Sequence, residues 1–439
     1  QLLMIRRLVN FSMDPDQEEL YRYFMKQDTI DFFQLLVDID MPQTLRLITY
    51  LRAMGVLDLD SPANWTDNLK ECYQQYKDLY ETQYLAHKNV PFQDSDPLQP
   101  SENCPFIRRH KLLTLEKQIG LDINRLFSGD AFFILPDVRA AVHQITTVWC
   151  HVLNNDVYKQ GIHEIFAFCY QITFDAITSN FVKHTKDFML HHLTLLNKTN
   201  LNALAFALGT QLMRMIYQLY SNDELMTQRM GQIQNQLLLK LDQPLHERIL
   251  QLNLESVYLI RWLRLLFCRE VPLKLVTRLW DFIIFSFQSQ KSNQFLDYLV
   301  ISFYQQKRSE IMKNDYNMVM RLFSNSLLET IQKQELELVC QKALQLQQLK
   351  ETVKDGEKTV SKPQNKVSHV QKYFAKLLKE SLEAWGRPEA TGAVQEVMEL
   401  LEKLNAENVD VYWDVLKNAQ IIGNLKNPVS AVIEAIDQK

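Results

Sequence analysis

The sequence predicts an all-α protein. Only 10 glycines and 13 prolines occur in 439 residues, so few tight hairpin turns can form. Leu, Gln, Lys, Glu and Met are abundant, and these residues have high helix propensity. Over long stretches, apolar side chains recur every three or four positions, which gives a helix one apolar face. A chain of this length can bury a large core in two or three packed units or in one elongated unit.

The first predicted helices lie between residues 17 and 88. The segments 17–39 and 41–57 show the helical spacing, with Pro42 near the start of the second. Residues 65–88 are strongly amphipathic. Their apolar and aromatic face carries Leu69, Tyr73, Tyr76, Leu79 and Tyr80. Residues 90–106 are rich in proline and polar side chains and predict a loop.

Closely spaced helices are predicted from residue 107 to 345, with one polar interruption at YSNDELMTQRMGQ. The following segment, LKETVKDGEKTVSKPQNKVS, carries almost no apolar side chains and predicts a linker. Shorter helices are expected beyond it, the last of them opened by Pro428. We therefore expect N-terminal helices at 1–42, a large helical domain at 43–345, a linker at 346–366 and a C-terminal helical region at 367–439.

Charge and motif content argue against several classes of protein. Lys and Arg total 48 against 52 Asp and Glu, so the basic excess of a nucleic-acid binder is missing. The scattered cysteines form no CxxC pair and no zinc-type cluster, and we expect reduced structural thiols. They are Cys72, Cys104, Cys150, Cys169, Cys268 and Cys340. His143, His151 and His163 lack a cysteine or carboxylate at ligand spacing, so core or rim positions are expected rather than a metal site. No Gly-x-Ser-x-Gly motif of a serine hydrolase occurs.

The sequence predicts at most peripheral membrane association. No apolar run reaches the ~18 residues that cross a bilayer, because Arg261 and Arg264 interrupt YLIRWLRLLF. No signal peptide is visible, so an intracellular protein with unmodified sequons at Asn10, Asn64 and Asn197 is expected. The segment VQKYFAKLLKESLEAWG is amphipathic and basic near its start. It fits a partner helix, a membrane surface or packing onto neighbouring helices.

The first stretch with a chemical pattern is KLLTLEKQIGLDINRLF. Its apolar residues share one helix face, which we expect to be buried: Leu112, Leu115, Ile119, Ile123 and Leu126. Asp122 and Arg125 are i, i+3 neighbours off this face and close enough to touch. Taken alone, they fit an ordinary surface ion pair worth under about 1 kcal/mol.

The second stretch is YKQGIHEI. Gly161 allows a sharp turn or a close approach of the backbone. Gln160 carries a neutral amide that both donates and accepts hydrogen bonds, so it can orient a water molecule without becoming charged. Taken alone, the pattern also fits the start of an ordinary helix.

The third stretch is YLIRWLRLLFCREVPLKLVTRLWDFII, which predicts two core helices. We expect Pro272 to end the first helix and open the second. Their inner faces are predicted at Leu259, Trp262, Leu263 and Leu266, and at Val276, Leu279, Trp280 and Ile283.

In this order, the three stretches resemble the TBC domain of Rab GTPase-activating proteins over roughly residues 43 to 305. The matching motifs are Ile119, Asp122 and Arg125; Tyr158, Gln160 and Gly161; Arg261 and Trp262; Arg269, Glu270 and Pro272; Trp280 and Asp281. The chain departs from the family pattern at Leu126, Phe127 and Ser128, at Phe168, at Val271 and at Tyr50. These departures leave the Arg and the Gln in place and affect loop geometry and partner choice.

The resemblance implies a helical domain of two subdomains that accelerates GTP hydrolysis by a Rab in its GTP form. Arg125 and Gln160 would act as catalytic fingers in trans. Asp122 would hold Arg125, and we expect Tyr158 and Gly161 to support the Gln160 turn. GTP and Mg²⁺ would belong to the Rab, so no cofactor or metal of its own is expected. The alternative is a catalytically weak scaffold or Rab effector, although such proteins usually lose one or both fingers.

The segment YKQGIHE looks most like a subgroup of the family that has His rather than Asn at the position of His163. Members of that subgroup act in endosome and Golgi traffic. The resemblance therefore implies a cytoplasmic protein that works at the surface of these membranes in vesicle traffic.

Overall fold

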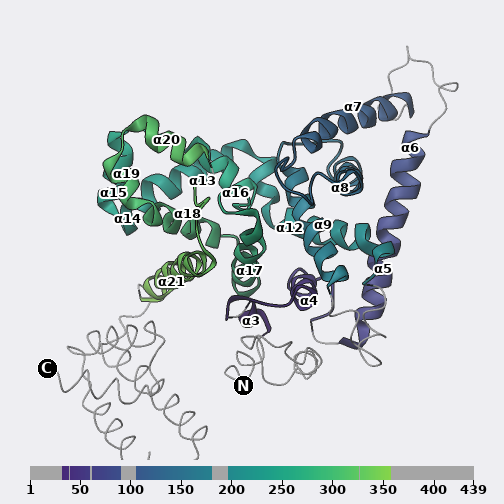
Figure 1. Cartoon of the computed structure of the whole chain (residues 1–439), viewed down its shortest axis with the longest axis horizontal. Coiled ribbons are helices and arrows are strands. Elements are labelled where there is room, and N and C mark those ends of the chain that lie inside the picture. The colour runs from purple at the N-terminus through teal and green to yellow at the C-terminus, as the bar shows by residue number, and fades with distance from the viewer. Residues whose placement is uncertain are drawn as a thin grey trace, which may run out of the picture. The chain divides into compact units, whose positions relative to one another are not determined.

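The computed structural model describes residues 32–38, 40–59, 62–89, 105–179, 196–325 and 327–356 (Figure 1). Every regular element in these ranges is a helix, which confirms the all-α fold class. The helices of the first half are α3 (Phe32–Asp38), α4 (Gln43–Ala53), η1 (Pro62–Asn64), α5 (Trp65–Asp78), η2 (Leu79–Leu85), α6 (Ala86–Lys88), α7 (Pro105–Asn124), α8 (Pro136–Val148), η3 (Trp149–Leu153) and α9 (Ile162–Thr178).

The second half of the described chain continues with further helices. They are η4 (Lys198–Asn200), α12 (Leu201–Ser221), α13 (Asp223–Gln232), η5 (Ile233–Leu237), α14 (Leu238–Leu241), α15 (Gln243–Gln251), η6 (Ser256–Tyr258), α16 (Leu259–Arg264), α17 (Leu273–Gln290), α18 (Phe295–Gln306), α19 (Arg308–Lys313), α20 (Tyr316–Ser324) and α21 (Lys333–Gly356). Residues 17–31 of the helix predicted at 17–39, and residues 90–104 of the loop predicted at 90–106, lie outside the described residues; the last two residues of that predicted loop begin α7 instead.

Helix α12 lies between two groups of helices. It packs against α5, α8 and α9 in one group and against α13 and α16 in the other (Figure 1). Its contact with α9 is close because Gly209 has no side chain: a Cβ there would lie 2.4 Å from the Phe166 ring. A large apolar core therefore runs from one group of helices into the other.

A buried ion pair fastens α4 to α17. The carboxylate of Asp281 is fully buried and accepts hydrogen bonds from Arg46 Nε at 2.9 Å and from the Tyr50 hydroxyl at 2.8 Å. Tyr50 is one of the departures from the family pattern, and its hydroxyl takes part in this pair. Because charges in a low-dielectric core need partners, the pair fixes how the two helices meet.

Helix α3 lies before the predicted start of the large domain at residue 43, and helix α21 passes its predicted end at residue 345. Helix α3 packs against α17, and Arg278 donates to the carbonyl of Val37 at 3.0 Å. Helix α21 is joined to α17 through Glu337, which pairs with Arg278 at 2.7 Å. It continues to Gly356, so the predicted linker at 346–366 begins as helix. Lys, Glu and Gln favour helix even where apolar side chains are few.

The first compact unit of the chain ends at Gln347. The C-terminal helices predicted beyond residue 367 lie outside the described residues. Within the described ranges, no helix is both long enough and apolar enough to span a membrane.

Two helix ends differ from the sequence prediction. Helix α16 ends at Arg264, well before Pro272, because the chain turns through positive φ at Leu266 (47°) and Phe267 (59°). The polar interruption predicted after residue 220 is a sharp corner at Asn222, after which α13 begins at once. The Asn222 side chain accepts hydrogen bonds from two backbone amides of α13, so a polar residue starts the next helix instead of a loop.

Candidate functional site

The segment around Arg125 follows the C-terminus of α7. The predicted apolar face of this helix is buried throughout, from Leu112 to Leu126. Arg125 lies just past the last turn, its side chain 64% exposed, and its Nη2 donates to Asp122 Oδ1. The Asp122 side chain is only 9% exposed. The pair is therefore anchored on a buried carboxylate, unlike an ordinary surface ion pair. We call residues 122–128 the Arg125 segment.

The turn that carries Gln160 depends on a backbone shape that favours glycine. Gly161 has φ +106° and caps α9, and a Cβ at this position would lie 2.5 Å from Leu265 Cδ2. The predicted sharp turn and close approach at Gly161 are thus both present. The Gln160 side chain is exposed and makes no hydrogen bond to any residue that the structure describes. We call residues 158–161 the Gln160 turn.

A buried tyrosine joins the two segments. The hydroxyl of Tyr158 donates to Asp122 Oδ2 at 2.6 Å, while the other oxygen of the same carboxylate holds Arg125. Burial, together with the hydrogen bond to Asp122, raises the pKa of Tyr158 well above its usual value, so the phenol keeps its proton. Asp122 therefore brings an exposed guanidinium and the turn with an exposed carboxamide to one part of the surface.

A second link was not predicted from the sequence. Arg269, in the turn between α16 and α17, donates to Glu164 Oε2 at 2.7 Å and lies over the Phe127 ring at 5.6 Å. Burial raises the pKa of Glu164, and Arg269 opposes this shift. Phe127 has φ +35° and packs against Phe168, with ring centroids 5.3 Å apart. Two departures from the family pattern, Phe127 and Phe168, are thus in contact beside Arg125.

Comparison with known proteins identifies the domain. Residues 78–312, more than half of the chain, match the Rab-GTPase-TBC domain family. The chain belongs to this family. The structure of the Ypt/Rab-GAP domain of Gyp1p has the same fold, with a TM-score of 0.58 and 18% identity over 79% of this chain and 98% of that domain.

Curated relatives are distant. TBC1 domain family member 5 of Homo sapiens is 25% identical over 305 residues, which cover 62% of this chain and 38% of the human protein. TBC1 domain family member 5 homolog B of Dictyostelium discoideum is 27% identical over 123 residues, 28% of this chain and 12% of that protein. The match therefore spans well under half the length of either relative.

The Gln160 turn of the TBC domain is also tied to its second group of helices. Lys159 Nζ pairs with Asp223 at 2.9 Å, and Arg264 Nη2 pairs with the same carboxylate at 2.7 Å. These two cations lower the pKa of Asp223. The hydroxyl of Tyr220 donates to the backbone carbonyl of Arg264 at 2.7 Å. The turn is therefore supported by residues from both groups of helices.

The remaining candidates of the sequence analysis take structural positions in the TBC domain. His143 hydrogen-bonds to the carbonyl of Glu116 at 2.9 Å, and His151 lies between His87 at 2.7 Å and Asp156 at 2.5 Å. Among the described residues, no group of His, Cys, Asp or Glu could hold a metal ion. Every cysteine of the described ranges is buried and free, and Cys104 lies outside those ranges. Burial raises the pKa of Cys72 to about 12, so this thiol stays protonated.

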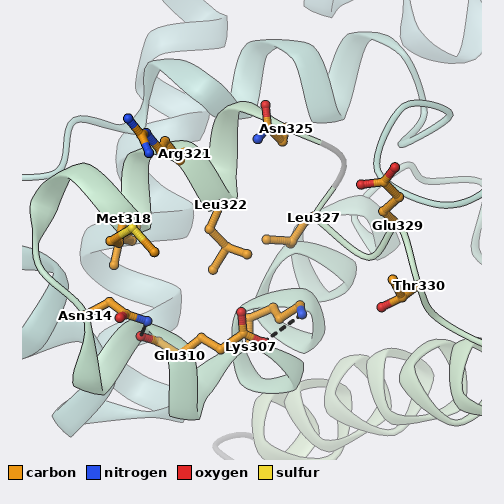
Figure 2. A pocket seen from close by; sticks show the side chains of 11 residues that line it. Lys307, Glu310, Asn314, Met318, Arg321, Leu322, Asn325, Leu327, Glu329 and Thr330 are labelled. Carbon is orange, nitrogen blue, oxygen red and sulfur yellow. Dashed lines mark hydrogen bonds and ion pairs between the residues drawn. The ribbon is translucent and has the colours of Figure 1, made fainter.

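An open pocket lies between α19, α20 and the segment after α20 (Figure 2). None of the residues of the Arg125 segment or the Gln160 turn lines it. Lys307 and Glu310 pair with each other at 2.7 Å, and Asn314 donates to the carbonyl of Glu310 at 2.8 Å (Figure 2). Apolar and polar side chains are mixed over the rest of the lining, so the pocket does not indicate a particular ligand chemistry.

Proposed function

We propose that this TBC domain accelerates GTP hydrolysis by a Rab GTPase in its GTP form, with Arg125 and Gln160 as catalytic fingers. The observation that carries the proposal is the pairing of the two segments: both side chains are exposed, and the hydroxyl of Tyr158 joins the Gln160 turn to the carboxylate beneath Arg125. A second protein can therefore reach both groups from outside. Family membership supports a Rab as that protein.

The chemistry of GTP hydrolysis fits the two side chains. Negative charge builds on the phosphate oxygens as water attacks in line, so catalysis depends on positioning and charge stabilisation. Arg125 stays charged, and its planar fork can bridge two oxygens, which a lysine cannot reproduce. Gln160 can accept a hydrogen bond from the attacking water and donate one to a phosphate oxygen. In this proposal Asp122, Tyr158 and Gly161 hold the two fingers.

The nucleotide and Mg²⁺ belong to the Rab in this proposal. The TBC domain contributes only the two side chains and the surface around them. We also propose that the protein acts in vesicle traffic at Golgi or endosomal membranes, which it reaches by peripheral association. The resemblance of the YKQGIHE segment to a subgroup that acts in endosome and Golgi traffic supports this assignment.

Single-turnover GTP hydrolysis by a panel of purified Rabs tests the proposal. For a responsive Rab, Arg125→Lys and Gln160→Ala should each lower the acceleration, by about 10³-fold for the arginine and about 10- to 100-fold for the glutamine. Arg308→Lys and Gln218→Ala serve as controls. Arg308 is also a half-exposed arginine in an ion pair, and Gln218 is an exposed glutamine on another helix.

The panel also decides between activation and binding alone. If Arg125→Lys and Gln160→Ala keep the full acceleration, the assignment of the fingers is wrong. If the chain binds a Rab tightly in the GTP form but accelerates hydrolysis by none of them, the protein is an effector or a scaffold. The loss of function in either control variant would instead indicate damage to the fold.

A further inference from the structure

Three buried side chains, one from α7, one from the Gln160 turn and one from the start of α9, form one hydrogen-bond chain beneath the two fingers. His163, in the first turn of α9, lies with Nδ1 2.7 Å from the hydroxyl of Tyr158. The same hydroxyl lies 2.6 Å from Asp122 Oδ2. All three residues are buried: the exposed fraction of the whole residue is 2% for His163, 8% for Tyr158 and 6% for Asp122. The hydrogen-bond chain is therefore shielded from water, and its polar atoms depend on one another for their hydrogen bonds.

We propose that His163 is a positioning residue for the Arg125 finger, acting through Tyr158 and Asp122. The inference rests on the proposed function, because positioning matters only if Arg125 acts on a GTPase. The inference follows from the positions of the protons in the two hydrogen bonds of the Tyr158 hydroxyl. The phenol carries one proton and donates it to Asp122 Oδ2 in the 2.6 Å bond. The hydroxyl oxygen must then accept its second hydrogen bond, so Nδ1 of His163 carries a proton and donates it.

The charge state of His163 agrees with this arrangement. Burial, together with the nearby guanidinium groups of Arg269 and Arg125, lowers the pKa of His163 to about 4 against the opposing effect of Asp122. At neutral pH the imidazole is therefore uncharged and carries a single proton. The bond to Tyr158 sets that proton on Nδ1, since the hydrogen bonds of a histidine decide its tautomer.

The hydrogen-bond chain keeps the Asp122 carboxylate oriented toward Arg125. A phenol hydroxyl rotates about its C–O bond, and without a donor behind it the proton has other directions available. His163 donates a hydrogen bond to the hydroxyl oxygen of Tyr158. The hydroxyl proton of Tyr158 then points toward Asp122. Asp122 then stays fixed by one oxygen and holds Arg125 with the other. The finger is thus held in place before the Rab arrives, which lowers the cost of ordering it during the reaction.

Asparagine is the informative substitution at this position. Nδ1 of histidine and Nδ2 of asparagine are both bonded to Cγ, so His163→Asn can place an N–H close to the same point. His163→Leu fills the space but offers no donor. In single-turnover assays on a responsive Rab, we expect His163→Leu to lower the maximal rate about 3- to 10-fold, the value of one lost hydrogen bond. His163→Asn should retain most of the rate, and the Rab concentration at half-maximal rate should change little in both.

A double-mutant cycle separates positioning from a general packing role. In a Tyr158→Phe background the hydrogen-bond chain is already broken, so adding His163→Leu should cause no further loss of rate. Additive losses would overturn the proposal, as would equal losses in His163→Asn and His163→Leu when both variants unfold at the same urea concentration as the unsubstituted chain.

A measurement that needs no Rab tests the proton directly. NMR of the full chain with ¹⁵N-labelled histidine reports which ring nitrogen of His163 is protonated, with His163→Asn used to assign its signal. We expect a neutral ring with the proton on Nδ1 at pH 7. A proton on Nε2 alone overturns the proposal. If the unsubstituted chain accelerates no Rab, the proposed function fails, and the NMR result still decides whether the hydrogen-bond chain exists.

Discussion

The Arg125 segment and the Gln160 turn meet at Asp122, but they are held in different ways. Side chains hold Arg125: a carboxylate beneath it and a phenol behind that carboxylate. The backbone holds Gln160, because Gly161 turns through φ +106° with no room for a Cβ. A substitution of Arg125 should therefore change catalysis without changing folding. A substitution of Gly161 should change both. A protein can thus position one group through adjustable contacts and another through a fixed turn.

The largest expected effect on folding comes from Gly161→Ala. An alanine at φ +106° is strained by about 1–2 kcal/mol, and its Cβ, 2.5 Å from Leu265, forces that side chain to move. We expect the free energy of unfolding to fall by about 2–4 kcal/mol in total, with a loss of acceleration as the turn shifts. Urea unfolding monitored by circular dichroism measures the first effect, and single-turnover hydrolysis measures the second.

Gly231→Ala is the matched control for this substitution. Gly231 lies inside α13, and nothing lies within 4 Å of a Cβ built there. Since alanine favours helix over glycine, this variant should be stabilised by about 0.5–1 kcal/mol. Equal stability of the two variants would contradict a backbone-held Gln160 turn.

Acid should weaken the junction between the two segments. Folded His163 stays neutral because burial lowers its pKa to about 4, whereas the unfolded residue titrates near its ordinary 6.5. The contribution of neutral His163 to the free energy of unfolding is therefore fully present above pH 6.5 and is lost as the pH falls toward 4. At pH 5 the loss should reach about 2 kcal/mol. Urea unfolding at pH 7 and pH 5 measures it.

The comparison must be made against His163→Asn, which cannot titrate. Burial also raises the pKa of Glu270 to about 7, with Arg261 opposing the shift. Since folded Glu270 takes up a proton before the unfolded residue does, this group gains stability in acid and works against His163. The difference between the unsubstituted chain and His163→Asn cancels such terms. An identical pH dependence in both would rule out a neutral, buried His163.

Local features of the site could be predicted from the sequence because they depend on spacing. The buried face of α7, the contact of Asp122 with Arg125 and the sharp turn at Gly161 all follow from residues a few positions apart. Helical periodicity likewise predicted the all-α fold. Helix ends were predicted less well. Helix α16 stops at Arg264 because Leu266 and Phe267 adopt positive φ, which helix propensity does not predict.

Pairings between distant segments could not be predicted in this way. Arg269 and Glu270 are adjacent, yet Arg269 pairs with Glu164 and Glu270 pairs with Arg261 at 2.8 Å. The sequence offers several acids to each arginine, and only the packing of the helices selects among them. Tyr158 is a similar case. It was expected to support its own turn, whereas its hydroxyl reaches Asp122 on another segment.

The smallest expected effect concerns Arg269, which links the Arg125 segment to the first turn of α9. Arg269→Ala leaves the buried Glu164 without its ion pair and removes the cation over Phe127. Because the Arg269 side chain is 41% exposed, solvent screens the pair, and we expect a loss of only about 1 kcal/mol in unfolding free energy. The acceleration should fall about 3-fold, since Phe127 then holds the Arg125 segment less firmly.

Arg308→Ala provides the control for Arg269→Ala. Its side chain is 43% exposed and pairs with Asp242, whose side chain is 10% exposed, so the two pairs are alike in solvent access. Both variants should lose similar stability in urea unfolding, because similar pairs are broken. Only Arg269→Ala should lose acceleration, since it alone contacts Phe127 and Glu164. Equal hydrolysis rates in the two variants would mean that the Arg125 segment depends on Asp122 and its hydrogen-bond chain alone, and the second link would then be structural without any effect on the finger.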